Sequence, residues 1–214
     1  SMDQSNIREK NRHTVIKAAQ RLFLEEGTNR TSINRIAGEA GLSATSVCRY
    51  FENKDNLIFA VWKDSLITFY NELMPYYEEK AAGLKTGYER FLCCLQCHID
   101  IYNRFPSWLT YTREMFSTVE TQPHRRDEYD SEAGKVDAYW EFYNKEIPLP
   151  ILKALQDGVK DGSIRGDVNV YEVYQLVFNV YTGQNIYQYF TGSSQPTDIY
   201  ALTVKMLAQY LKAE

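Results

Sequence analysis

Residues 14–57 constrain the fold most, because apolar side chains recur there at three- and four-residue steps that are interrupted by glycines. The first helix predicted by this spacing ends at Gly27, and its apolar face is formed by Val15, Ile16, Ala19, Leu22 and Phe23. A second helix of about two turns, with Thr31 as its expected N-cap, ends at Gly41 and carries Ile33, Ile36, Ala37 and Ala40 on its apolar face. The spacing therefore predicts two surface helices, each with one buried stripe.

A third short helix follows the turn that contains Gly41. Ser43 is its expected N-cap and the helix runs over residues 44–50, after which Asn53 is the expected cap of a fourth helix that begins at Lys54. A helix, a turn of about four residues and a second short helix form a helix-turn-helix.

The third helix has the composition of an element that approaches DNA. It opens with Ala44, Thr45 and Ser46, whose small side chains would let the helix come close to base edges. Arg49 and Tyr50 can reach phosphates, and Arg49 can also reach a guanine edge. The alternative is that short capped helices are common in helical proteins and that Thr and Ser serve only as caps.

The same segment resembles the DNA-binding domain of the tetracycline repressor (TetR) family of bacterial transcription regulators. The matching residues are Ala18, Ala19, Leu22, Phe23, Gly27, Thr31, Ile33, Ile36, Ala37, Ala40, Gly41, Ser43, Tyr50, Phe51, Lys54 and Leu57. Beyond Leu57 the chain is similar to the family only in its length, its helical character and the rough order of its helix signals.

The resemblance implies a homodimer in which each head places its third helix in a major groove of a palindromic double-stranded DNA operator. A larger C-terminal domain would dimerise and hold a small-molecule effector. Carried onto this chain, the residues expected at phosphates are Thr31, Ser43, Tyr50 and Lys54, and those expected nearest the bases are Ala44, Thr45, Ser46 and Arg49. Cys48 departs from the family, which usually has a tyrosine there, so one expected contact to the DNA backbone is missing.

The charge of the chain is unevenly distributed. The formal net charge is −4, but residues 1–55 hold nine basic and seven acidic groups, a net charge of +2 that leaves −6 for the rest. Charges are screened over about 8 to 10 Å in ordinary salt, so an acidic body does not exclude a DNA-binding head. No secretory segment opens the chain and no run of about 20 apolar residues occurs, so we expect a cytoplasmic protein with no membrane partner.

The pattern of the whole chain predicts an all-α fold of about nine helices. Residues 1–53 form the expected three-helix, helix-turn-helix DNA-binding domain, and residues 54–214 the expected helical ligand-binding and dimerisation domain. Pro75 is expected to bend or end the fourth helix, and Pro106 to lie in the first turn of a sixth. A fifth helix is expected over residues 86–103, and a loop at 121–126 is expected to precede a long seventh helix. Pro148 and Pro150 interrupt that helix, and the chain is expected to be helical again up to Lys160. The last two helices are expected over residues 169–190 and 197–212.

Aromatic residues are concentrated beyond residue 54, and they predict a pocket for a flat, apolar or cationic ligand. Glu114 and Glu141 could balance a positive charge. The candidate ligand-binding residues are Trp62, Leu66, Phe69, His98, Trp108, Tyr111, Glu114, Met115, Trp140, Glu141, Tyr143, Phe178 and Tyr181. The alternative for any one of them is an ordinary place in an aromatic core.

The last two predicted helices are apolar on more than one side, which is enough for a core face and a partner face. In the family these helices pair with their copies as a four-helix dimer interface. The candidate dimer-interface residues are Val173, Leu176, Val177, Val180, Gly183, Gln184, Ile199, Leu202, Met206 and Tyr210. Ordinary core packing is the alternative.

The motif C-x-x-C-H, which is the attachment signature of c-type haem, occurs in the run Cys93, Cys94, Leu95, Gln96, Cys97, His98. It lies within an amphipathic predicted helix, and attachment would need an export route, so haem is not expected. Cys93 with Cys97 and Cys94 with His98 share a helix face and could sense a soft metal or redox state, although buried cysteines of the core are the commoner case.

Catalysis is not indicated, because His13, His98 and His124 have no nucleophile context and no Gly-rich phosphate loop is present. We therefore expect that the protein is not an enzyme and that it has no catalytic residue, cofactor or metal site. The main hypothesis is a ligand-responsive DNA-binding repressor. The alternatives are a regulator that senses metal or thiol redox state through Cys93, Cys94, Cys97 and His98, and a helical interaction module that has lost DNA binding.

Overall fold

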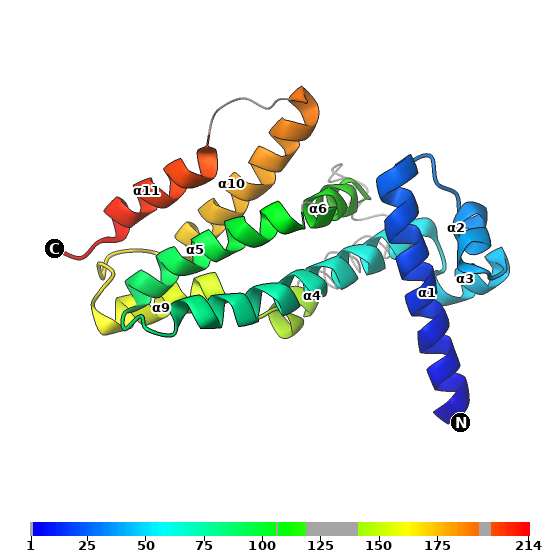
Figure 1. The fold of residues 1–214 in the computed structure, drawn as a ribbon, viewed down its shortest axis with the longest axis horizontal. Coiled ribbons are helices and arrows are strands. Elements are labelled where there is room, and N and C mark those ends of the chain that lie inside the picture. The colour runs from blue at the N-terminus through cyan, green and yellow to red at the C-terminus, as the bar shows by residue number, and fades with distance from the viewer. Residues whose placement is uncertain (1, 106, 119–140, 193–197) are drawn as a thin grey trace, which may run out of the picture. The chain divides into compact units, whose positions relative to one another are not determined.

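The computed structural model describes residues 2–105, 107–118, 141–192 and 198–214, and it confirms the all-α fold (Figure 1). The head contains α1 (Met2–Glu26), α2 (Ile33–Ala40) and α3 (Ala44–Phe51). The helices that follow are α4 (Lys54–Ala81), α5 (Gly87–Arg104), α6 (Ser107–Thr118), α9 (Pro150–Asp161), α10 (Val170–Thr191) and α11 (Ile199–Leu211). The predicted loop at 121–126 lies outside the described residues.

The chain forms two compact units. Unit 1 comprises Ser1–Ile67 and Thr110–Asn144, and unit 2 comprises Thr68–Leu109 and Lys145–Glu214. Unit 1 therefore contains the head and the first part of α4, whereas unit 2 contains α5, α9, α10 and α11. The predicted domain boundary between residues 53 and 54 stays a prediction.

The head is held together by the apolar stripe that its sequence predicts. The stripe of α1 is buried against α2 and α3, and the buried side chains are Val15, Ala18, Ala19, Leu22, Phe23, Ile36, Ala37, Val47 and Phe51. Gly27 and Gly41 have φ angles of +85° and +70°, which a residue with a Cβ rarely adopts, so both end their helices as expected. Asn53 accepts a hydrogen bond from the Asn56 backbone nitrogen at 2.8 Å and caps α4 as predicted.

One N-cap was predicted wrongly, and one helix does not end where its proline was expected to bend or end it. Ser32, and not Thr31, is the N-cap of α2, because the Ser32 side chain accepts the bond from the Arg35 backbone nitrogen at 3.1 Å. α4 also continues through Pro75 to Ala81. Proline removes one backbone hydrogen bond and crowds the carbonyl four residues earlier, and the hydroxyl of the next residue, Tyr76, donates to Asp100 at 2.6 Å.

Two glycines bring α5 and α9 into close contact in unit 2. A methyl group added to Gly87 would lie 2.0 Å from the Gly158 nitrogen, and one added to Gly158 would lie 2.4 Å from the Ile164 side chain. Any larger residue at Gly87 must push the helices apart, whereas one at Gly158 must first displace the Ile164 side chain. The close approach places the first turn of α5 against the last turn of α9.

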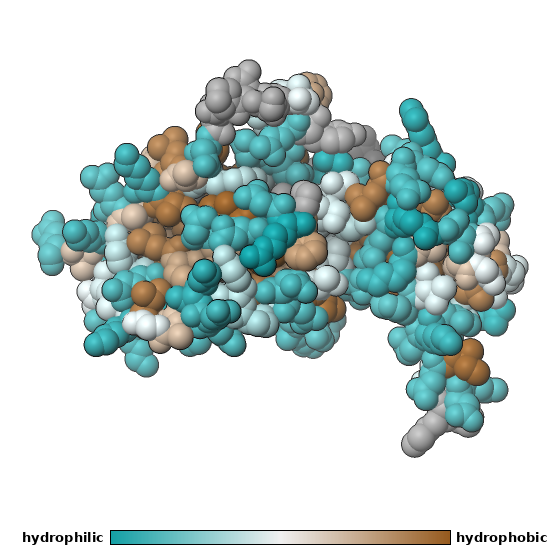
Figure 2. All heavy atoms as spheres, viewed as in Figure 1, coloured by the Kyte–Doolittle hydropathy of each residue, from teal (hydrophilic) through white to brown (hydrophobic). Residues whose placement is uncertain are grey.

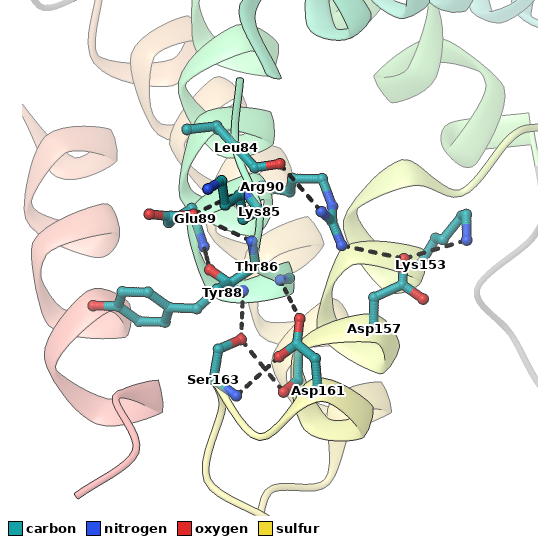
Figure 3. Close-up of polar contacts among 12 residues, drawn as sticks. Leu84, Lys85, Thr86, Tyr88, Glu89, Arg90, Lys153, Asp157, Asp161 and Ser163 are labelled. Atoms are coloured by element: carbon teal, nitrogen blue, oxygen red, sulfur yellow. Dashed lines mark hydrogen bonds and ion pairs between the residues drawn. The ribbon is translucent and has the colours of Figure 1, made fainter. Parts of the chain in front are cut away.

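The exposed backbone donors at the start of α5 are all satisfied at this crossing (Figure 3). The Gly87 nitrogen donates to Asp161 at 2.8 Å and the Tyr88 nitrogen donates to Ser163 at 3.1 Å. Thr86 and Glu89 form a reciprocal capping box on the remaining donors. Because the first turn of a helix leaves its N–H groups without internal partners, this arrangement fixes where α5 starts relative to α9.

Candidate DNA-binding and effector-binding sites

The outward face of α3 carries small, polar and cationic side chains. Thr45, Cys48 and Arg49 are exposed, whereas Val47 and Phe51 of the same helix are buried in the head. Ser43 caps the helix: its hydroxyl accepts from the Ser46 nitrogen at 3.1 Å. The helix can therefore present one face to a partner while the opposite face holds it to α1 and α2.

The side chains predicted to bind phosphate do not all lie at the surface. Tyr50 and Lys54 are half-buried and Ser43 is exposed, so their polar groups remain at the surface. Thr31 is buried, with 1% of its surface exposed, and its hydroxyl donates to the Gly27 carbonyl at 2.7 Å. Thr31 thus closes the loop between α1 and α2.

Ion pairs leave part of the positive charge of the head uncompensated. Arg12 pairs with Glu9 and Lys17 with Asp64. Arg21 pairs with Glu39, and Arg35 pairs with both Glu26 and Glu39. Within the described ranges, the cations of the head that make no ion pair are Arg8, Lys10, Arg30, Arg49 and Lys54. Two of these, Arg49 and Lys54, were predicted to bind DNA.

The helices α10 and α11 expose large apolar side chains. Leu176, Ile199, Leu202, Met206 and Tyr210 expose between 36% and 62% of their surfaces. Figure 2 shows hydrophobic atoms at the surface over these two helices. A groove of about 450 Å³ lies between the helices and is lined by Val173, Leu176, Val180, Met206, Leu207 and Tyr210, among others.

The ten predicted dimer-interface residues divide into two groups on these helices. Val173 and Val177 are buried within the chain, and Val180 and Gln184 are half-buried. The other six are exposed, and a methyl group added to Gly183 would meet no atom within 4 Å. Tyr187 and Phe190, which were not among the predicted residues, expose 54% and 88% of their surfaces. Their spacing from Gly183, four and then three residues, continues the same helix face and could have identified them.

Comparison with known proteins identifies the head. Residues 15–61 match the family model described as "Bacterial regulatory proteins, tetR family". Residues 15–61 therefore form a tetR-family domain. The HTH-type transcriptional regulator HbdR of Aromatoleum sp. (strain CIB) is 40% identical over 65 residues, which are 30% of this chain and 28% of HbdR. The chain thus aligns with less than a third of the length of that relative.

Two further comparisons extend over most of the chain. The HTH-type transcriptional repressor KstR2 of Mycolicibacterium smegmatis is 23% identical over 174 residues, 78% of this chain and 73% of KstR2. The crystal structure of FadR from Bacillus subtilis in complex with stearoyl-CoA superposes with a TM-score of 0.63, covering 93% of this chain and 98% of FadR at 19% identity. The second comparison shows that this chain shares the fold of FadR.

In unit 2, several of the predicted ligand-binding residues gather in an aromatic cluster. The rings of Phe69 and Tyr102 stack at 5.0 Å, and those of Tyr102 and Trp108 stack at 5.2 Å. Tyr181 of α10 meets Tyr102 edge to face at 5.0 Å. Tyr102 is the centre of the cluster, although the sequence analysis did not select it. Phe178 is half-buried on α10.

In unit 1, several predicted ligand-binding residues already have polar partners inside the protein. Trp62 donates to the Thr112 hydroxyl at 3.2 Å, and Tyr111 donates to the Gln20 carbonyl at 2.9 Å. Glu114 accepts a hydrogen bond from Thr28. Leu66, Met115 and Tyr143 are buried, Glu141 is exposed, and Trp140 lies outside the described residues. These contacts favour a core role for Trp62 and Tyr111.

His98 lies fully buried beside the aromatic cluster. Its Nδ1 is 2.7 Å from the Cys94 carbonyl oxygen, and its ring centre is 5.8 Å from that of Phe69. Burial lowers the pKa of His98 to about 4, so the imidazole is neutral near pH 7. A neutral ring suits packing against aromatic neighbours.

Of the three cysteines of α5, Cys94 and Cys97 are buried in the core and Cys93 is half-buried. The sulfur atoms of Cys93 and Cys97 are 4.0 Å apart, and Cys94 Sγ is 3.6 Å from His98 Nδ1. Burial raises the pKa of the Cys97 thiol to about 12 and also raises the pKa of Cys94, so both stay protonated. In the part of the chain that the structure describes, no group of three or more His, Cys, Asp or Glu side chains could hold a metal ion.

A second apolar groove in unit 2 was not predicted from the sequence. It has a volume of about 630 Å³ between the end of α4 and the start of α9. Its apolar lining includes Met74, Tyr77, Ile147, Leu149 and Leu152, and the charged residues Glu78, Arg90, Lys153 and Asp157 also line it.

Among the described helices, none has the length and hydropathy needed to cross a membrane.

Proposed function

We propose that this protein is an effector-responsive transcriptional regulator that binds operator DNA through α3. The observation that carries the proposal is the outward face of α3, where Thr45 and Arg49 are exposed beside a buried face that anchors the helix. The tetR-family match over residues 15–61 supports it. Repression is the proposed outcome, because DNA-bound protein near a promoter blocks its use.

The proposed contacts follow from exposure and charge. Ser43, Tyr50 and Lys54 bind phosphates and fix the register of α3, while Ala44, Thr45, Ser46 and Arg49 lie nearest the bases. Ser46 takes part in the cap with Ser43, so Thr45 and Arg49 carry most of the base selection. Thr31 is left out of the proposed contacts because it is buried.

A homodimer on a palindromic operator is the proposed assembly. The exposed faces of α10 and α11 support it, because apolar side chains of this size are stabilised by burial against a partner. A twofold axis between two copies would present two α3 helices to half-sites about one helical turn apart. The proposed location is the cytoplasm, where chromosomal DNA of bacteria is accessible.

The proposed effector is a small molecule with a flat apolar or cationic part. The stacked rings of Phe69, Tyr102 and Trp108 support this class, because aromatic faces attract both apolar surface and cations. A fatty acyl thioester is a second candidate, favoured by the apolar groove of about 630 Å³ and by the stearoyl-CoA in FadR. α4 belongs partly to each unit and is the proposed route by which the effector changes DNA affinity.

Selection from a random duplex library, followed by a gel shift with the gene's own upstream region, tests the function. The proposal predicts a palindromic consensus and saturable binding of two chains per duplex. Thermal shift with planar cations, acyl-CoA compounds and metal ions then identifies the effector, which must also weaken DNA binding. No enrichment of any sequence would favour the alternative of an interaction module without DNA binding, and release by zinc, copper or diamide would favour the metal or redox sensor.

A further inference from the structure

The first turns of α1 lie outside the region that matches the tetR family. The helix begins at Met2, whereas the match begins at residue 15. Figure 1 shows these turns projecting past α2 and α3. They carry Arg8, Lys10 and Arg12 together with Asp3 and Glu9, and they have no apolar stripe that would bury them in the head.

Three residues on one face of this segment converge on the end of α3. The Asn11 side chain donates to the Tyr50 hydroxyl at 3.1 Å, and the Arg12 guanidinium donates to the Tyr50 carbonyl at 2.7 Å. Arg8 lies over the Tyr50 ring at 5.6 Å, and Arg12 lies over the Phe51 ring at 4.6 Å. Steps of three and four residues place Arg8, Asn11 and Arg12 on one helix face.

These contacts fix both the side chain and the backbone of Tyr50. The Tyr50 carbonyl is one of the last in α3, where carbonyl groups have no partner within the helix and attract cations. The Tyr50 hydroxyl accepts the Asn11 hydrogen bond and keeps its own proton for a further acceptor. A phosphate oxygen that approaches the hydroxyl would therefore meet a donor that is already oriented.

Arg8 supplies a second positive group at the same place. It is exposed, and it makes no ion pair with any residue that the structure describes. A guanidinium held over an aromatic ring still directs its N–H groups outward, and it binds phosphate in a fixed geometry. Lys10 is just as exposed but lies about 200° around the helix from Arg8, on the side that faces away from Tyr50.

We propose that residues 8–12 form a second DNA-binding element, in which Arg8 binds a backbone phosphate beside the one bound by Tyr50. Asn11 and Arg12 are positioning residues that act through Tyr50 and the end of α3. The partner is the DNA phosphodiester backbone, so the element adds affinity without selecting bases. The inference rests on the proposed function, because it assumes that α3 faces DNA.

The test uses the full chain and the duplex that the wild-type protein selects from a random library. Fluorescence anisotropy at several salt concentrations should show that Arg8→Ala weakens binding about 10-fold on selected and unrelated duplexes alike, and that the salt slope becomes shallower by about 0.9 per chain, or about 1.8 for two chains on one duplex. Lys10→Ala removes the same charge from the same helix and should change affinity less than about 2-fold. Arg8→Lys keeps the charge but loses the planar set of guanidinium donors, so its DNA affinity should lie between those of Arg8→Ala and Lys10→Ala.

Asn11→Ala separates positioning from charge. It should weaken binding about 3-fold with an unchanged salt slope, because no charge is removed and one hydrogen bond is lost. In the Tyr50→Phe background, Asn11→Ala should have no further effect, because its partner is already missing. Circular dichroism and the melting temperature show whether each variant keeps its fold, and Arg8→Gln replaces Arg8→Ala if the latter unfolds.

The outcomes that overturn the inference differ from those that overturn the function. If the wild-type chain selects no DNA sequence, both are wrong. If the wild-type chain binds its duplex and Arg8→Ala binds equally well, or if Arg8→Ala and Lys10→Ala weaken binding equally, then α3 reads DNA and the second element does not exist.

Discussion

The outward face of α3 and the outward face of α10 and α11 are built from opposite kinds of side chain. On α3 the exposed residues are short or cationic, such as Thr45 and Arg49. On α11 they are large and apolar, such as Leu202 and Met206, which expose 51% and 62% of their surfaces. Salt screens contacts between charges but does not weaken apolar burial. The difference indicates two partners, a polyanion for α3 and an apolar surface for α10 and α11.

The largest effect is expected from placing charges on the apolar face. The double substitution Leu202→Asp with Met206→Asp should weaken dimerisation about 1000-fold, because the dimer loses about 1 kcal/mol for each of the four half-exposed side chains that the interface would bury. Analytical ultracentrifugation over a concentration series measures this. Leu24→Asp is the matched control, because Leu24 is an apolar residue of the head with 48% exposure. A wild-type chain that stays monomeric at high concentration would show that no second copy covers the apolar face of α10 and α11.

Acid should destabilise unit 2, which contains His98, more than the head. The pKa of His98 is lowered to about 4 in the folded chain, so its stabilising effect is complete above about pH 6.5 and is lost as the pH falls toward 4. The loss amounts to about 3 kcal/mol. Urea unfolding of the wild type and of His98→Gln from pH 7 to pH 4.5 measures it, with His13→Gln as the exposed control. Equal pH dependence in the wild type and His98→Gln would show that His98 does not titrate in this range.

A smaller effect is expected from removing the unpaired cation on α3. Arg49→Ala should weaken DNA binding about 10-fold and make the salt slope shallower by about 0.9 per chain, or about 1.8 for two chains on one duplex. Arg35→Ala removes the same charge, but Arg35 is already paired with Glu26 and Glu39, so it should change affinity much less. Anisotropy titrations between low and moderate salt provide both numbers. Identical slopes for the two variants would mean that net charge, and not the face of α3, attracts DNA.

The smallest effect concerns the departure from the family pattern. Cys48 is exposed on the same face as Thr45 and Arg49, so Cys48→Tyr adds a hydroxyl without disturbing the core. It should strengthen binding about 3-fold on all duplexes, because a phosphate contact carries no base information. Cys48→Phe adds the ring alone and should show no such gain. If Cys48→Tyr changes sequence preference instead, position 48 lies nearer the bases than proposed.

The parts of this fold that were predictable depend on signals close together in the sequence. Gly27, Gly41, Ser43 and Asn53 act within one turn of their own helices, and the helix ends that they predict agree with the structure. Thr31 and Ser32 are adjacent and both suit a cap, so only their contacts could decide between them.

The parts that were missed depend on contacts between distant residues. The close approach of Gly87 and Gly158, 71 residues apart, cannot be read from either glycine alone. The contacts of Asn11 and Arg12 with Tyr50 likewise join segments 39 and 38 residues apart. Val173 and Val177 share an apolar helix with Leu176, and periodicity does not show which of its sides faces the chain's own core.

Binding of the full chain to a duplex selected from a random library tests the central claim most directly. We predict saturable, sequence-dependent binding of two chains per duplex, with an affinity that falls steeply as salt rises and that Arg49→Ala reduces more than Arg35→Ala does. Binding that is independent of sequence, or no binding at low salt, would contradict the account.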